Sequence, residues 1–226
     1  GAGAPRALAA CARARGAEVA AAAEAGTLLD GERVLTLSRS GTVLAALWAG
    51  DPDGVVVAES RPGGEGADVA KALAAELDVT LCPDAAVAQV LAGLPDASSE
   101  DRDGGIDVVL VGADAVLADG GVVNKVGTRA SALAAAREGV ACYAVAARAK
   151  VAPGRESGEG NGRYPSLGAA DPAGVYDGDA ALDVAAPLFD VTPPDLLDGV
   201  VTEDGVLGAG EIAAVAAEHR AFADWD

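Results

Sequence analysis

The chain has 226 residues, of which 51% are hydrophobic, and its 35 acidic and 16 basic side chains give a net charge of −19. This hydrophobic content excludes a collagen-like, low-complexity or disordered protein, because enough apolar surface is present to offset the entropy of ordering the chain. A pI near 4.2 argues against a surface for free DNA or RNA, which needs clustered lysine and arginine. The acidic excess predicts a halophilic protein, since high salt screens the repulsion between like charges.

The chain length predicts one domain over 29–226, preceded by an N-terminal helix over 1–28. No apolar stretch approaches the roughly 18 residues of a membrane-spanning helix, so we expect no membrane contact and a cytoplasmic location. Cys11, Cys82 and Cys142 form no Cys-x-x-Cys pair and are expected to be reduced core thiols, with no metal site. The glycine spacing does not match a dinucleotide fingerprint, and we expect no cofactor.

The first half of the chain alternates short apolar runs with helix-forming segments. The run over 106–111 is almost continuous, which is typical of a strand buried on both faces. Because helices separate the strands, we predict an α/β fold with an open, mostly parallel sheet and right-handed crossovers. The expected elements, in chain order, are a helix over 5–24, a strand over 33–37, a helix over 42–48, a strand over 54–59, a helix over 67–77, a strand over 79–82, a helix over 85–91 and a strand over 106–111.

The second half has a less regular pattern. Thr128 is the predicted N-cap of a helix, and the Gly-, Pro- and Asp-rich segment over 153–179 is predicted to be irregular, as functional or disordered loops often are. The remaining expectations are a polar loop over 94–105, a tight reversal over 115–123, a helix over 128–138, a strand over 140–146, a turn at the end of 189–194, a strand over 200–202 and a closing helix over 208–222.

Polar residues follow the first two predicted strands. Ligands of open parallel sheets bind beyond the carboxyl ends of the strands, where helix N-termini present unpaired N–H groups. Arg61 lies in the second such loop, over 59–66. It either binds a phosphate or carboxylate group in a bidentate manner or forms a surface ion pair with Glu59 or Glu65. The first loop is either an anion site or an ordinary helix cap, and it consists of Ser38, Arg39, Ser40, Gly41 and Thr42.

The third and fourth strand ends carry carboxylates. Asp84 follows the third strand and is expected to cap the next helix. Asp114 ends the fourth strand, and Asn124 and Lys125 follow the reversal just before a Gly-Thr helix start. An acid, an amide and an ammonium group placed together suit a phosphorylated polyol, although Asp114 as a purely structural cap is the alternative. His219 is expected to be an ordinary surface residue.

The segment that follows the fourth strand carries a family signature. Residues 111–128, Val-Gly-Ala-Asp-Ala-Val-Leu-Ala-Asp-Gly-Gly-Val-Val-Asn-Lys-Val-Gly-Thr, closely resemble the signature of the initiation factor 2B alpha/beta/delta family. That family also contains methylthioribose-1-phosphate isomerase and ribose-1,5-bisphosphate isomerase. Supporting stretches occur in the family's order over 34–44, 59–66, 83–87 and 189–194, so the resemblance spans roughly residues 18–208.

The resemblance implies a Rossmann-like sheet with helices on both faces and an N-terminal helical domain that is reduced or absent. Family isomerases interconvert aldose and ketose sugar phosphates with a cysteine in the first strand-end loop and an aspartate in the long motif. The aspartate position matches Asp114, whereas Ser38 stands at the cysteine position. Regulatory initiation-factor relatives also lack that cysteine, and a hydroxyl does not replace a thiol in acid/base chemistry near neutral pH without strong activation.

Two functions follow from the residues and the resemblance together. The first is an initiation factor 2B-like protein, regulatory or weakly catalytic, that binds a phosphorylated sugar or nucleotide. The alternative is an aldose–ketose isomerase for ribose-1,5-bisphosphate or methylthioribose-1-phosphate that uses Asp114 with Ser38, or with Cys82 instead. We expect a homodimer or higher homo-oligomer, and a translation initiation factor is a further candidate partner. The predicted ligand-binding residues are Arg39, Ser40, Gly41, Thr42, Arg61, Asn124 and Lys125.

Overall fold

The computed structural model of the chain describes residues 3–93, 105–154 and 168–223. Most of the loop expected over 94–105, and the middle of the irregular segment expected over 153–179, lie outside these described residues. The helices and strands are α1 (Gly3–Gly26), β1 (Arg33–Leu37), α2 (Gly41–Ala49), β2 (Gly54–Ala58), α3 (Glu65–Leu73), β3 (Val79–Cys82), α4 (Val87–Leu91), β4 (Val108–Gly112), β5 (Ala115–Val116), β6 (Val122–Lys125), α5 (Thr128–Glu138), β7 (Ala141–Val145), β8 (Phe189–Thr192), β9 (Gly199–Thr202), β10 (Gly205–Leu207) and α6 (Ala209–Ala223).

The main sheet has seven strands in the order β3-β2-β1-β4-β7-β9-β10. All neighbouring pairs are parallel except β9 and β10, which are antiparallel, so the predicted open, mostly parallel α/β fold is confirmed. The chain builds outward from β1 to β3, then returns to the middle at β4 and builds outward in the other direction. This reversal is the topological switch point of a doubly wound sheet, and ligands of such folds bind outside the strand ends at that point.

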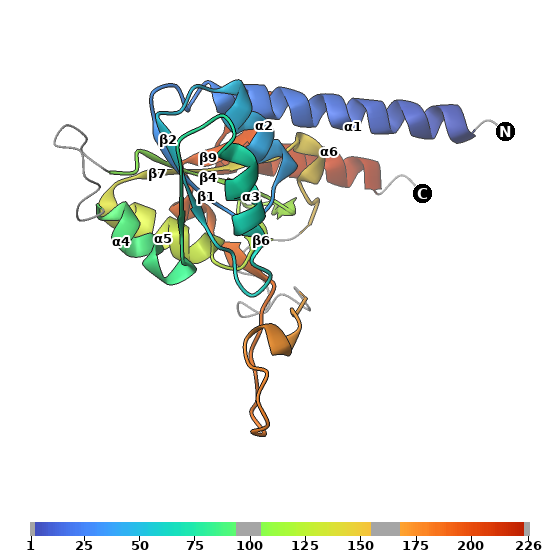
Figure 1. Cartoon of the computed structure of the whole chain (residues 1–226). Coiled ribbons are helices and arrows are strands. Elements are labelled where there is room, and N and C mark those ends of the chain that lie inside the picture. Colours follow the sequence, from blue (N-terminus) through green and yellow to red (C-terminus); the bar gives the residue numbers. More distant parts are fainter. Residues whose placement is uncertain (1–2, 94–104, 155–167, 224–226) are drawn as a thin grey trace.

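Alternate residues of the central strands pack into two separate hydrophobic layers. In β2, Val56 faces a layer with helices α4, α5 and α6, whereas Val55 and Val57 face a layer with α1, α2 and α3. Figure 1 shows α1 and α2 on one side of the sheet and α4 and α5 on the other. Both faces of the inner strands are therefore covered, which explains why β2 and β4 are apolar throughout and lack the alternation of a half-exposed strand.

A second, three-stranded antiparallel sheet has the order β5-β6-β8. The predicted reversal forms β5 and β6. Strand β8, which is absent from the predicted elements, precedes the turn predicted at the end of 189–194, and it pairs with β6, which lies more than 60 residues before it in the chain. Strand β10 is also absent from the predicted elements; among the described residues it pairs with β9 alone, in a hairpin at the sheet edge. Helix α3 ends at Leu73, four residues before its predicted end.

Some smaller expectations also differ from the structure. Cys11 is exposed on α1, so the prediction of three core thiols is wrong for this residue, whereas Cys82 and Cys142 are buried. Within the described part of 153–179, the only helical element is a single 3-10 turn at Pro172–Gly174, and Figure 1 shows this orange segment extending away from the body of the molecule. No helix among the described residues is long and apolar enough to cross a lipid bilayer.

Candidate functional site

A cavity of about 670 Å³ opens at the carboxyl ends of β1 and β4, on either side of the switch point. The loops that follow these two strands lie very close together, and Gly112 at the end of β4 makes this possible. A Cβ atom at position 112 would lie 2.7 Å from both Cβ and Oγ of Ser40. The absence of a side chain at Gly112 therefore brings the loop after β1 against the loop after β4, where the cavity forms.

The N-terminus of α2 forms one wall of the cavity. Ser40 is its N-cap, and the Ser40 hydroxyl accepts a hydrogen bond of 3.3 Å from the N–H of Val43. Gly41 and Thr42 occupy the first turn and line the cavity together with Arg39. The predicted anion site at this strand end thus has free first-turn N–H groups, the positive end of a helix dipole and a guanidinium group within one wall.

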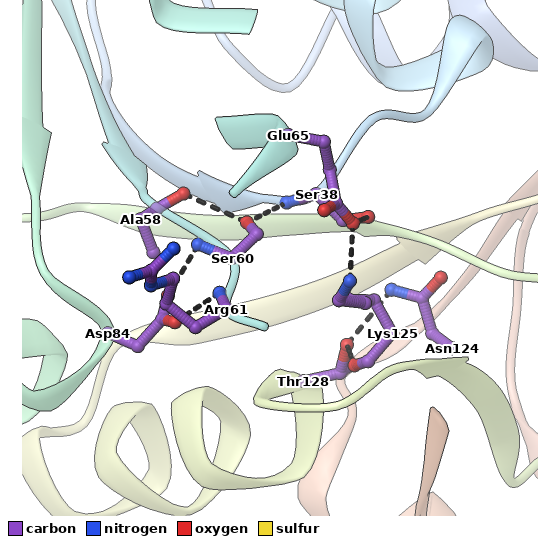
Figure 2. A network of polar contacts seen from close by, with 9 residues as sticks. All are labelled: Ser38, Ala58, Ser60, Arg61, Glu65, Asp84, Asn124, Lys125 and Thr128. Carbon is purple, nitrogen blue, oxygen red and sulfur yellow. Dashed lines mark hydrogen bonds and ion pairs between the residues drawn. The ribbon is translucent and has the colours of Figure 1, made fainter. Parts of the chain in front are cut away.

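The loop after β2 is organised by Asp84, which does not cap the following helix as predicted. Its carboxylate accepts hydrogen bonds from the backbone N–H groups of Ser60 (2.8 Å) and Arg61 (2.6 Å), as Figure 2 shows. The Ser60 hydroxyl donates to the carbonyl of Ala58 (2.9 Å) and accepts from the N–H of Ser38 (2.6 Å). Asp84 therefore fixes the second strand-end loop against the first.

Ser38 is joined to Glu65 and Lys125 in a short chain of polar contacts (Figure 2). The Ser38 hydroxyl donates to Glu65 Oε1 at 3.0 Å, and Lys125 Nζ lies 2.7 Å from the same oxygen. The Lys125 side chain is 6% exposed and that of Glu65 is 25% exposed. Burial by itself would raise the pKa of Glu65, but the hydrogen bonds from Lys125, the backbone and Ser38, with the charge of Lys125, lower this pKa below its ordinary value.

The long motif continues from β6 into α5. Asn124 Nδ2 donates to the Thr128 hydroxyl (2.9 Å), and that hydroxyl donates to the carbonyl of Lys125 (2.7 Å). The N-cap of α5 is Gly127 and not Thr128, so that prediction is wrong. Asp190 of β8 serves the helix end instead, by accepting hydrogen bonds from the N–H groups of Gly127 (2.8 Å) and Arg129 (3.1 Å). These contacts fix the direction in which Asn124 and Lys125 enter the cavity.

Asp114 and Lys150 lie on the wall beyond β4. The backbone N–H of Asp114 donates to Val123 O (2.9 Å), which anchors the turn, and its side chain lines the cavity. Lys150 Nζ donates to the carbonyl of Ala113 at 2.7 Å, immediately before Asp114. An ammonium group has three N–H donors, so this contact, the one that Lys150 makes with a described residue, leaves donors that can face a ligand in the cavity.

The cavity brings together most of the predicted site residues but not all. Ser38, Arg39, Ser40, Gly41, Thr42, Asp114, Asn124 and Lys125 all line it. Arg61 does not: its side chain is 63% exposed, and its Nε lies 3.9 Å from the Glu59 carboxylate, which corresponds to the surface ion pair considered as its alternative role. Cys82 is also outside the lining, and burial first, then the charges of Asp84 and Glu59, raise the pKa of its thiol to about 11.

Several lining residues lie outside the set predicted from the sequence, namely Arg15, Glu18, Glu65, Lys150, Leu188 and Phe189. The rarity of lysine in the sequence is the signal that could have pointed to Lys150, since the chain has only three lysines. Two of the three line this cavity. Among the described residues, the lining holds four basic side chains, of 16 in the chain, and three acidic ones, of 35 in the chain. In so acidic a protein, this reversal of the charge balance indicates a site for an anionic ligand.

The chain is similar in sequence to proteins named as sugar-phosphate isomerases. Residues 6–209 match the profile of the Initiation factor 2 subunit family. The chain is 36% identical over 191 residues to Ribose 1,5-bisphosphate isomerase of Haloferax volcanii, a match that covers 80% of this chain and 54% of that protein. It is 35% identical over 188 residues to Methylthioribose-1-phosphate isomerase of Xylella fastidiosa, covering 78% and 49%. The chain thus spans about half the length of the curated relatives it matches.

Solved structures show the same fold. The Pyrococcus horikoshii translation initiation factor eIF-2B superposes with a TM-score of 0.74 at 28% identity, covering 90% of this chain and 68% of that chain. The 5-methylthioribose 1-phosphate isomerase of the same organism superposes with a TM-score of 0.74 at 23% identity, covering 91% and 59%. The second likeness concerns the fold alone.

Proposed function

Since the chain belongs to the Initiation factor 2 subunit family, we propose that it is an aldose–ketose isomerase of pentose 1-phosphates, with ribose-1,5-bisphosphate as the preferred substrate. The observation that carries this proposal is the gathering of Asp114, Asn124, Lys125 and Lys150 around one cavity at the switch point. The sequence alone favours an initiation factor 2B-like, regulatory or weakly catalytic protein. The curated relatives are named as sugar-phosphate isomerases, and these names favour the isomerase function instead.

The charges of the cavity support a substrate with two phosphate groups. Lys125 is already paired with Glu65 at 2.7 Å. Arg15, Arg39 and Lys150 also line the cavity, and among the described residues none of these three forms an ion pair with a carboxylate. One phosphate would bind at the first turn of α2 beside Arg39, and the other would bind the ammonium group of Lys150.

The remaining polar groups would hold the sugar. Asn124 and Lys125 are placed to bind its hydroxyls, and the Asp114 carboxyl group is the candidate acid/base for protons on oxygen. Ser40, Gly41 and Thr42 contribute to the phosphate site through the helix start. We assign no ligand contact to Arg61 and no proton transfer to Cys82, because neither residue lines the cavity.

The test is an assay of ribose-1,5-bisphosphate and methylthioribose-1-phosphate for ketose formation, at low and at high KCl concentration. We expect turnover of the bisphosphate with the higher kcat/KM, and a loss of about 10²- to 10⁴-fold in kcat on Asp114→Asn, as for removal of a general acid/base group. Asp195→Asn removes an exposed carboxylate away from the cavity and should leave turnover unchanged. Absence of ketose from both substrates would overturn the proposal.

A specific observation keeps the regulatory function as the second candidate. Ser38 stands where the family isomerases have a cysteine, and the regulatory relatives share this absence. Under this alternative, a phosphorylated sugar or nucleotide would raise the melting temperature of the chain without being converted. Self-association belongs to this alternative and is tested by the molar mass in solution with and without the ligand. Contact with a translation initiation factor belongs to it too and is tested by the molar mass of a mixture of the two proteins.

A further inference from the structure

The enediol route from aldose to ketose needs a group that moves a proton between two carbon atoms, and the wall of the cavity formed by Ser38 and its neighbours offers candidates. Ser38 depends on a neighbouring base, because a serine hydroxyl becomes reactive only beside one. Its own proton is already donated to Glu65 Oε1 at 3.0 Å. Among the described residues that line this wall, the carboxylate next to Ser38 is that of Glu65.

The position of Glu65 is set by close packing of the loop before α3. Gly66, the next residue, sits directly on the end of β2, and a Cβ there would lie 1.9 Å from the carbonyl oxygen of Ala58. A Cβ at Gly63 would lie 2.3 Å from Glu65 Oε2, so the carboxylate passes closely over this glycine. Two glycines thus allow the side chain of Glu65 to turn from the first turn of α3 into the cavity.

We propose that Glu65 is the catalytic base that carries the carbon-bound proton of the isomerisation, and that Ser38 and Lys125 position its carboxylate. This inference rests on the proposed isomerase function and adds to it a residue that the sequence pattern does not single out. Burial would raise the pKa of Glu65, but its contacts with Lys125, the backbone and Ser38 lower this pKa and so favour the ionised carboxylate in the free protein.

The substrate enters the reaction as an aldose 1-phosphate in its ring form, and Glu65 takes the proton from its C2 atom. The electron pair of that C–H bond forms a C1=C2 double bond, and the bond between C1 and the ring oxygen breaks. The Asp114 carboxyl group donates a proton to the released oxygen. Asp114 then takes the proton of the C2 hydroxyl as the C2 carbonyl forms, and Glu65 returns its proton to C1. No oxidant, reductant or further reactant is needed.

Lys125 connects substrate binding to the strength of this base. In the structure its ammonium group is 2.7 Å from the Glu65 carboxylate. A substrate oxygen that accepts a hydrogen bond from Lys125 would share this ammonium group, and the stabilisation of ionised Glu65 would weaken. The carboxylate then becomes a stronger base in the complex than in the free protein.

The experiment compares four forms of the 226-residue chain with ribose-1,5-bisphosphate. Glu65→Gln retains an oxygen that accepts from Lys125 and should lose about 10²- to 10⁴-fold in kcat while KM changes by less than about threefold. Ser38→Gly removes the hydroxyl, suits the backbone φ of 63° at this position, and should reduce kcat by about tenfold or less. Asp68→Asn removes another, exposed carboxylate of the same helix turn and should be unchanged.

A second measurement, the turnover of Glu65→Ala with added formate, separates a catalytic role of Glu65 from a purely structural one. Formate added to Glu65→Ala should restore part of the lost turnover, because a small carboxylate can occupy the vacated space. The role of Glu65 is overturned if Glu65→Gln keeps its kcat within tenfold, if Ser38→Gly loses as much as Glu65→Gln, or if formate restores nothing. Failure of the wild-type chain to form ketose overturns the isomerase function itself, and the role of Glu65 with it.

Discussion

Two serines near the cavity adopt backbone conformations that are unusual for residues other than glycine. Ser38 has a φ of 63° and Ser60 a φ of 67°. Such conformations cost about 1–3 kcal/mol each and persist only where surrounding contacts hold them. Here the Ser60 hydroxyl binds the N–H of Ser38, and Asp84 binds the N–H of Ser60. The strain therefore lies where the two strand-end loops meet at the site.

The Glu65–Lys125 pair gives a pH-dependent prediction. Glu65→Gln should lower the free energy of unfolding by about 1–3 kcal/mol at about pH 7, because Lys125 loses its charged acceptor. The pKa of Glu65 is lowered in the folded chain from 4.5, so this stabilisation is present above that value and is lost as the pH falls through the folded pKa. Urea unfolding of both proteins from about pH 7 to about pH 3 measures the difference.

A matched control for this prediction is Glu59→Gln. Glu59 lies 3.9 Å from Arg61, and both side chains are well exposed, so its removal should change the free energy of unfolding by less than about 1 kcal/mol. A difference between wild type and Glu65→Gln that stayed the same down to about pH 3 would contradict the assignment of the stabilisation to the ionised carboxylate.

Among the elements, α6 has a role that its sequence does not suggest. His219 Nδ1 is 2.8 Å from the carbonyl of Val151, and Arg220 Nε donates to the carbonyl of Pro153 at 2.8 Å. Arg148 pairs with Asp204 at 2.9 Å and with Glu218 of α6. His219 is therefore half-buried and bonded, rather than the ordinary surface residue predicted. Together these contacts hold the segment that carries Lys150 into the cavity.

Replacing His219 tests this role of α6. A backbone carbonyl only accepts hydrogen bonds, so the ring nitrogen must donate, and His219→Ala should cost about 0.5–1.5 kcal/mol of stability. Because the segment then loosens, binding of ribose-1,5-bisphosphate should weaken by about two- to tenfold. His219→Asn keeps a donor at a similar position and should restore most of the affinity. Titration calorimetry of the three proteins measures this, and equal affinities would show that α6 does not position Lys150.

Basic side chains are over-represented around the cavity. Among the described residues, four basic and three acidic side chains line it, on a chain with a net charge of −19. The acidic surface repels itself and lowers the stability of the compact state, whereas the cavity keeps a local attraction for anions. Salt should act on these two properties in opposite directions.

We expect KCl to change both the stability of the chain and its affinity for an anionic ligand. The free energy of unfolding should rise between about 0.1 M and about 2 M KCl, because the screening length falls from about 10 Å to below about 3 Å. Ligand affinity should fall over the same range, since salt competes with the bound anion. Thermal unfolding measures the first effect, and near pH 4.2, where the net charge is about zero, it should largely disappear. A chain that loses stability in KCl at neutral pH would contradict the expected halophilic character.

The sequence by itself determined the succession of the main helices and strands, the parallel sheet and most of the strand-end residues. Each of these depends on neighbours along the chain: buried strands show as apolar runs, and the carboxyl ends of parallel strands share one edge. The pattern of residues is therefore sufficient to place Arg39, Asp114 and Lys125 together, and all three line the cavity.

Only the tertiary structure decided which side chains of those loops enter the cavity. Arg61 and Glu65 come from the same loop, yet Arg61 turns to the surface and Glu65 to Lys125. Lys150 and strand β8 depend on partners distant in sequence, namely Ala113 and β6. The physical reason is that side-chain direction and charge pairing are set by packing between segments far apart in the chain, which local propensity and periodicity do not contain.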